Sequence, residues 1–127
     1  MICVDCSALM AVLLGEPAAQ RCEVVLAEES ELVISAATLA EALIVSSHRG
    51  LEAEMTRLVE AARLRVIDVT TAAASRAAEA YRKWGRGRHA ARLNYGDCFA
   101  YELASHMACP LLYVGDDFAR TDLESAL

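Results

Sequence analysis

Four short, largely apolar runs separated by helical segments constrain the fold of this chain most strongly. The runs have the length and the Val, Ile and Leu content of strands, and they cover residues 1–4, 32–34, 64–69 and 110–114. Between them the spacing predicts helices over residues 8–14, 17–29, 36–48, 51–62, 72–84 and 94–107. This alternation is typical of an α/β domain, a mostly parallel sheet flanked by helices on both faces. A length of 127 residues suits one domain spanning residues 1–127.

The cysteines and the first residues indicate a cytoplasmic protein. Residues 1–4 lead into Asp5 without a basic segment, so we interpret them as a strand and not as a signal peptide. No apolar run approaches the roughly 18–20 residues of a membrane span. Five cysteines are an odd number without framework spacing, which favours free thiols. Cys3 and Cys6 match C-x-x-C, but no second pair completes a zinc site, so we interpret the match as coincidence.

Charge is distributed unevenly along the chain. A formal net charge of −6 argues against general affinity for nucleic acid. Five of the twelve Lys and Arg residues nevertheless fall within eleven positions, in and around a glycine-containing loop just before Asp97. We expect this basic segment to contact phosphates, and it comprises Arg82, Lys83, Arg86, Arg88 and Arg92. A solvated loop without that function is the alternative.

The stretch after the basic loop has the pattern of a helix start. Asn94 suits the N-cap, where its side-chain oxygen can accept a backbone N–H. Asp97 falls three residues later, where its carboxylate can reach back to the cap and where the helix dipole favours the ionised form. Asp97 is therefore either a capping acid alone or a capping acid that also belongs to a functional site.

Other isolated acids are predicted to lie near the same edge of the sheet. Asp5 ends the first strand, and Asp116 and Asp117 follow the fourth. Ligands of parallel sheets bind beyond the carboxyl ends of the strands. Glu41 shares its helix face with Thr38 and Ile44 among other apolar side chains, which is not the pattern of a solvated face. Glu41 then either has a partner or lies at the core rim with its carboxylate in water.

A cluster of carboxylates has a specific chemical meaning if the acids do converge. Asp5, Glu41, Asp97 and one of Asp116 and Asp117 would repel one another unless a cation held them. All-oxygen ligands suit Mg²⁺ or Mn²⁺, which orient phosphate oxygens and activate water. The three histidines have no metal-ligand spacing, and no Ser–His or Cys–His pair is evident locally.

The whole chain resembles the PIN-domain toxins of the VapC family. The resemblance is carried, in order and at family spacing, by Ile2–Ala8, Thr38–Glu41, Tyr81–Gly87 with Leu93–Cys98, and Pro110–Phe118 with Thr121-Asp122. It implies a metal-dependent endoribonuclease that is the toxin of a toxin–antitoxin pair and is often a homodimer. It also implies a VapB-like antitoxin whose C-terminal segment covers the acidic site, often with an Arg that reaches the carboxylates.

Two positions depart from the family pattern. Cys6 stands where Thr is usual, so Ser7 must supply a hydroxyl near the metal alone. Gly115 stands where many PIN domains carry their fourth acid, which leaves Asp117, or secondarily Asp116, for that role. The set implied for metal binding and catalysis is Asp5, Glu41, Asp97 and Asp117, supported by Ser7 and Asn94.

Two other functions are the alternatives. A receiver-like phosphoacceptor domain would need paired acids after the first strand and a lysine near the last one. Asp5 has no acidic neighbour, and the only lysine is Lys83. A catalytically inactive PIN fold that acts as a binding module is the other alternative, and the four retained acids argue against it.

Overall fold

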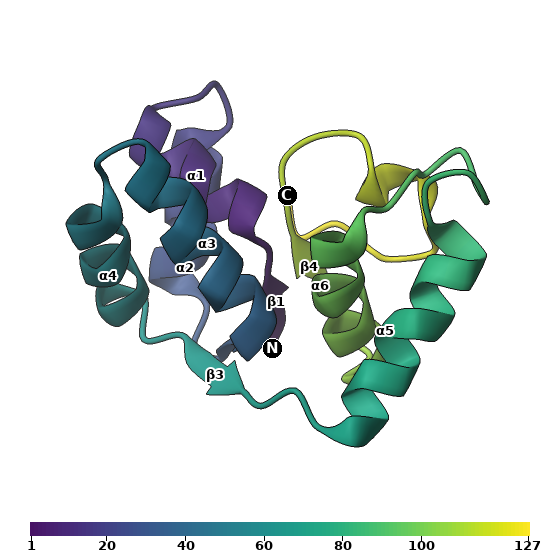
Figure 1. Cartoon of the computed structure of the whole chain (residues 1–127). Coiled ribbons are helices and arrows are strands. Elements are labelled where there is room, and N and C mark those ends of the chain that lie inside the picture. Colours follow the sequence, from purple (N-terminus) through teal and green to yellow (C-terminus); the bar gives the residue numbers. More distant parts are fainter.

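The computed structural model describes residues 1–127 and contains a sheet of four parallel strands in the order β3-β2-β1-β4 (Figure 1). The strands are β1 (Ile2–Val4), β2 (Leu32–Ser35), β3 (Arg65–Ile67) and β4 (Leu111–Leu112). Cys3 of β1 lies opposite Val33 of β2 on one side and Leu111 of β4 on the other. Parallel neighbours need long crossovers, and here each crossover consists of two helices. The predicted mostly parallel α/β fold is confirmed.

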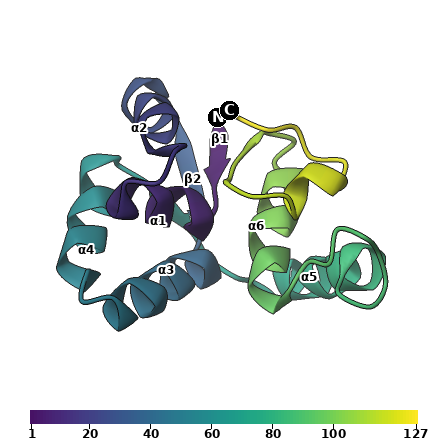
Figure 2. The same ribbon diagram turned by 90° about the horizontal axis from the view of Figure 1, so that it is seen from above.

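The helices lie on both sides of this sheet. They are α1 (Cys6–Leu14), α2 (Ala19–Glu28), α3 (Ala36–His48), α4 (Glu52–Ala61), α5 (Thr71–Trp84) and α6 (Tyr95–His106), followed by the 3₁₀ turn η1 (Phe118–Arg120). Both views place α1 to α4 on one side of β1 and α5 and α6 on the other (Figures 1 and 2). No helix is both long enough and apolar enough to pass through a bilayer.

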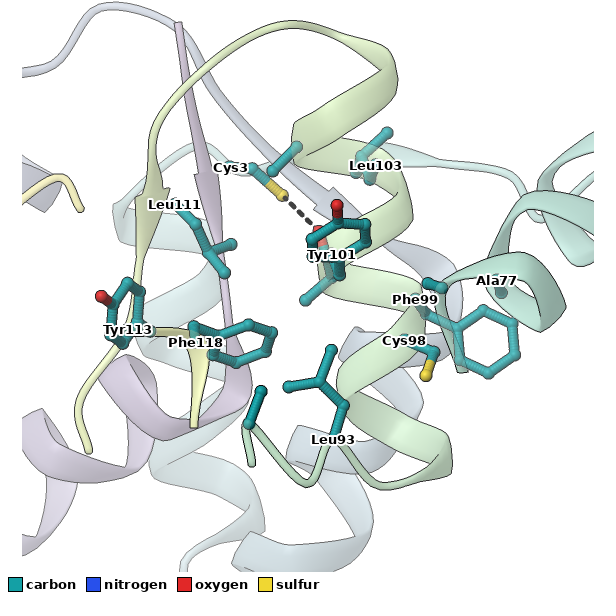
Figure 3. Close-up of a cluster of buried hydrophobic side chains, with 14 of the residues drawn as sticks. Cys3, Ala77, Leu93, Cys98, Phe99, Tyr101, Leu103, Leu111, Tyr113 and Phe118 are labelled. Atoms are coloured by element: carbon teal, nitrogen blue, oxygen red, sulfur yellow. Dashed lines mark hydrogen bonds between the residues drawn. The ribbon is translucent and has the colours of Figure 1, made fainter. Parts of the chain in front are cut away.

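Two core clusters form because successive strand residues point to opposite faces of the sheet. Cys3, Val33 and Leu111 belong to the cluster that also contains the buried face of α6 (Figure 3). Their neighbours Val4, Ile34 and Leu112 belong to the second cluster, with residues of α1, α2 and α4. β1 and β4 are thus apolar throughout because both of their faces are covered, whereas the edge strand β3 is largely exposed and begins with Arg65.

The thiols are dispersed through these clusters. Cys3 lies in the cluster around α6, where its Sγ contacts the carbonyl of Ala100 at 3.8 Å (Figure 3). Cys6 lies in the other cluster. All five cysteines are free, so the two residues of the C-x-x-C match do not form a disulfide.

Several element boundaries differ from the predicted ones. Helix α1 begins at Cys6 and not at Ala8, because Asp5 and not Ser7 is its N-cap. Pro17 lies in a turn, and α2 begins only at Ala19. The third and fourth strands are shorter than expected, with three and two residues.

Candidate active site

Asp5 lies at the carboxyl end of β1, where hydrogen bonds connect it with the start of α1 and, through Ser7, with the segment after β4. Its Oδ2 accepts hydrogen bonds from the Ser7 N–H at 3.0 Å and from the Ser7 hydroxyl at 2.6 Å. The same hydroxyl accepts from the Val114 N–H, just beyond β4, at 3.0 Å. Ser7 does not cap α1, whose N-cap is Asp5. It instead orients Asp5 and ties it to the segment that carries the C-terminal acids.

The other carboxylate oxygen of Asp5 has no partner. Asp5 is 3% exposed, and its Oδ1 is buried without a hydrogen bond. Burial raises the pKa of Asp5, the hydrogen bonds from Ser7 oppose this rise, and the charge of Asp117 adds to it. A buried acceptor without a donor is costly, so Oδ1 is suited to a ligand that carries positive charge or donates a proton.

Asp97 occupies the first turn of α6 as part of a capping box. Its N–H donates to Asn94 Oδ1 and its Oδ2 accepts from the Asn94 N–H, both at 2.9 Å, as the sequence predicted. The side chain is half-buried. The pKa of Asp97 is raised to about 6, mainly by burial. The hydrogen bond from Asn94 and the charge of Arg86 oppose this rise, and the charges of Asp5 and Asp117 add to it. Helix capping alone would lower this pKa, so burial and the neighbouring acids outweigh the cap in this environment.

Glu41 reaches the same region from α3. A Cβ atom on Gly96 would overlap Glu41 Oε2, so the carboxylate lies directly against the first turn of α6. Burial raises the pKa of Glu41 to about 7, the charges of Asp5 and Asp97 add to the rise, and a hydrogen bond with the Cys6 thiol opposes it.

The predicted environment of Glu41 is only partly correct. Thr38 is buried on that face, but Ile44 is 57% exposed and Val45 is 37% exposed. The face therefore changes from core to surface within two turns, and the half-buried Glu41 lies at that boundary.

Asp116 and Asp117 follow β4, and both are exposed. Only Asp117 raises the pKa values of both Asp5 and Asp97, whereas Asp116 is not among the charges that shift either group. Gly115 has φ +110°, a conformation that strains any residue with a side chain. An acid at position 115 would be strained in this conformation.

Asp5, Glu41, Asp97 and Asp117 thus form one electrostatic group, which we call the carboxylate cluster. The charges of Asp5 and Asp97 raise the pKa of Glu41, those of Asp5 and Asp117 raise the pKa of Asp97, and that of Asp117 raises the pKa of Asp5. No group of three or more His, Cys, Asp or Glu side chains is already arranged to hold a metal ion. The cluster is therefore an acidic site without a ready-made coordination shell.

The basic segment is divided between two surfaces. Arg82 and Arg86 line a groove of about 630 Å³ between α5 and the start of α6, together with Asn94. Lys83 lies elsewhere, in a different depression and 4.9 Å from the centre of the Trp84 ring. Arg88 and Arg92 are exposed in the loop.

Two residues of this region were not predicted from the sequence. Gly96 and Tyr95 stand beside Asp97, yet a single glycine or tyrosine in a helix start carries no local signal of a site. Gly96 is identified only by its approach to Glu41, and Tyr95 only by its place in the groove.

Carboxylates gathered at the carboxyl ends of parallel strands define an acidic α/β domain of the PIN type, and a family model described as PIN domain matches residues 2–124. Ribonuclease VapC30 of Mycobacterium tuberculosis is 40% identical over 123 residues, covering 94% of each chain. Ribonuclease VapC36 of the same species is 42% identical over 125 residues, covering 95% of this chain and 90% of that one. This chain belongs to the PIN-domain family and, within it, to the VapC ribonucleases.

Solved structures share the fold at low sequence identity. The VapC20 toxin of Mycobacterium tuberculosis, described as cleaving the sarcin-ricin loop, superposes with a TM-score of 0.76 at 18% identity and covers 97% of this chain and 96% of its own. VapBC2 from Rickettsia felis, bound to a promoter DNA fragment, gives 0.71 at 17% identity, with coverage of 98% and 97%.

Proposed function

We propose that this chain is the toxin of a toxin–antitoxin pair and an endoribonuclease that hydrolyses RNA phosphodiester bonds with Mg²⁺ or Mn²⁺. Its membership of the VapC ribonucleases supports the reaction class. The observation that carries the metal requirement is the partnerless, buried Oδ1 of Asp5 within a group of mutually repelling carboxylates. A divalent cation would satisfy that oxygen and cancel the repulsion.

The donor set fits a hard divalent cation. Asp5, Glu41, Asp97 and Asp117 would hold it, with Asp116 as a substitute for the fourth acid. Oxygen ligands are those that Mg²⁺ and Mn²⁺ prefer, and Mg²⁺ commonly keeps several waters and uses few carboxylates. When bound, such an ion lowers the pKa of a water and polarises a phosphoryl oxygen.

The chain's own residues position these acids. Ser7 fixes Oδ2 of Asp5 and leaves Oδ1 available. Asn94 fixes Asp97 at the start of α6, and Gly96 leaves room for the Glu41 carboxylate. Because its pKa is about 7, Glu41 holds a proton over part of the neutral range in the metal-free protein.

The partners follow from the family and the charges. Arg82, Lys83, Arg86, Arg88 and Arg92 would contact RNA phosphates, and the charge of Arg86 also acts on Asp97 of the carboxylate cluster. A VapB-like antitoxin would neutralise the toxin, with a cationic side chain at the acidic site. The VapBC2 structure supports such a partner, as does a toxin–antitoxin complex from Klebsiella pneumoniae with the same fold (TM-score 0.71 at 18% identity). We also propose a cytoplasmic homodimer.

Expression in a bacterial host tests the toxin role. Wild-type protein should arrest growth when expressed alone and be tolerated with its antitoxin. Soluble Asp97→Asn protein should be harmless, because it lacks one carboxylate of the cluster. Robust growth with soluble wild-type protein would contradict the toxin role and favour an inactive binding module.

A further inference from the structure

The groove between α5 and the start of α6 has the size and chemistry of a ligand site. Its volume of about 630 Å³ lies within the range of small-molecule pockets. Three alanines of α5 form one wall, and their small side chains leave the space open. Tyr95 and Phe99 of α6 form the opposite wall, and the other lining residues include Tyr81, Arg82, Arg86 and Asn94.

Tyr95 is the most unusual residue of this groove. Its side chain is 78% exposed although it is a large aromatic group. It rests edge-to-face against Phe99, with ring centres 5.0 Å apart and an interplanar angle of 80°. Phe99 is only 8% exposed and belongs to the core around α6 (Figure 3). Tyr95 therefore presents an open aromatic surface on a rigid support, which is the arrangement of a stacking platform.

The charges at the groove favour an anionic ligand. Arg82 and Arg86 line it in a protein whose formal net charge is −6, so positive charge is concentrated locally. Glu79 pairs with Arg82 at 2.8 Å, while Arg86 forms no ion pair and acts on Asp97. Asn94 both lines the groove and bonds to Asp97, so one end of the groove lies beside a member of the carboxylate cluster.

We propose that this groove is a nucleobase subsite, in which one unpaired base of the RNA stacks on Tyr95 while the adjoining phosphate contacts Arg86. The proposal rests on the proposed ribonuclease function and adds a preference for single-stranded RNA beside the cleaved bond. A base within a duplex is already stacked on both sides and cannot enter. Stacking tolerates any base, so the subsite selects unpaired RNA more strongly than a particular sequence.

A second copy of this chain is the competing occupant, because part of the groove is apolar. The arginines disfavour that occupant, because burying the unpaired charge of Arg86 against an apolar face of a second copy would be costly. They match a phosphate backbone instead.

Binding of a short, unstructured, fluorescein-labelled RNA to the full-length protein in EDTA tests the subsite. Tyr95→Ala should weaken binding about fivefold or more, the lower end of the effect of losing one stacked base. Tyr95→Phe should bind like wild type, because the ring and not the hydroxyl is needed. Val24→Ala, which alters an exposed apolar residue on α2, is the matched control and should have no effect.

An abasic substitution at each position of the RNA in turn sharpens the test. At one position, the loss of the base should weaken RNA binding by the wild-type protein. The same loss should not change RNA binding by the Tyr95→Ala variant. The proposal would be overturned if Tyr95→Ala bound RNA like wild type, or if Tyr95→Phe lost as much affinity as Tyr95→Ala. It would also be overturned if every abasic RNA lost the same affinity. Dissociation of a dimer by Tyr95→Ala, measured by light scattering, would overturn it as well, because the groove would then be an interface between copies.

Binding in EDTA is independent of metal-dependent cleavage, so the two proposals can fail separately. Base-dependent binding through Tyr95 without any cleavage would reject the hydrolytic function and retain the subsite. Metal-dependent cleavage with no effect of Tyr95→Ala on binding would reject only the subsite.

Discussion

Replacement of Asp97 by Asn should stabilise the metal-free protein at pH 8. The Asn side chain keeps an oxygen that can accept from the Asn94 N–H, so the start of α6 remains capped. It removes a negative charge that burial and the charges of Asp5 and Asp117 disfavour. The substitution therefore separates the cost of the charge from the benefit of the cap.

The size of the effect follows from the shift in pKa. A rise in the pKa of Asp97 from 3.8 to about 6 corresponds to about 3 kcal/mol. Solvent screening of this half-buried group reduces the cost to about 1–2 kcal/mol. Loss of the favourable interaction with the helix dipole, about 0.3–1 kcal/mol, opposes the gain. A net gain of about 1 kcal/mol remains, or about 3–5 °C in Tm for a chain of this length.

The gain should depend on pH in one direction only. Because the folded-state pKa is raised, the folded protein binds more protons than the unfolded chain between pH 3.8 and about 6. The stability of wild type therefore falls as pH rises through that window, and the full cost is present at pH 8. At pH 4 Asp97 is mostly protonated in the folded state, and the advantage of Asn should be small.

Thermal unfolding in EDTA at pH 4 and pH 8 measures both the gain in Tm from Asp97→Asn and its dependence on pH. Asp68→Asn, at an exposed position outside the carboxylate cluster, is the control for a change of charge alone. Addition of Mn²⁺ should raise the Tm of wild type more than that of Asp97→Asn. A less stable Asp97→Asn protein at pH 8, or an equal gain at both pH values, would refute the electrostatic reasoning.

Three further predictions concern the surroundings of the carboxylate cluster. Arg86→Ala and Arg88→Ala should each flatten the log–log salt dependence of single-stranded RNA binding by about 0.7, and an unchanged slope would exclude that arginine from the RNA site. Gly96→Ala should displace the Glu41 carboxylate and so weaken Mn²⁺ binding measured by calorimetry. The protein should lose no stability, because Ala favours a helix more than Gly does. Unchanged Mn²⁺ affinity would contradict this positioning role of Gly96. Cys98→Ser should remain active under reducing conditions, whereas a loss as severe as that of Asp97→Asn would give the thiol a catalytic role.

The fold was predictable because its signals are local and repeated. Apolar pairs such as Cys3 and Val4 serve two core clusters, which the strand-length runs already indicated. The capping box of Asn94 and Asp97 was predictable for the same reason, since its partners lie three residues apart.

The details of the site depend on contacts between distant segments, and sequence alone could not supply them. Asp5 and Ser7 can each cap a helix. The hydrogen bond from the Val114 N–H instead holds the Ser7 hydroxyl where it donates to Asp5. Glu41 is placed by its approach to Gly96, 55 positions further along the chain. Asp116 and Asp117 are adjacent and identical, so the sequence does not distinguish them. In the structure only the charge of Asp117 acts on both Asp5 and Asp97.

The most direct test of the central claim is RNA cleavage by wild type and by folded Asp97→Asn, each with Mg²⁺, with Mn²⁺ or with EDTA. Wild type should cut single-stranded RNA with either ion and not in EDTA, and Asp97→Asn should cut under none of these conditions while melting at or above the wild-type temperature. Cleavage that persists in EDTA, or in the folded Asp97→Asn protein, would contradict hydrolysis by a metal ion held in the carboxylate cluster.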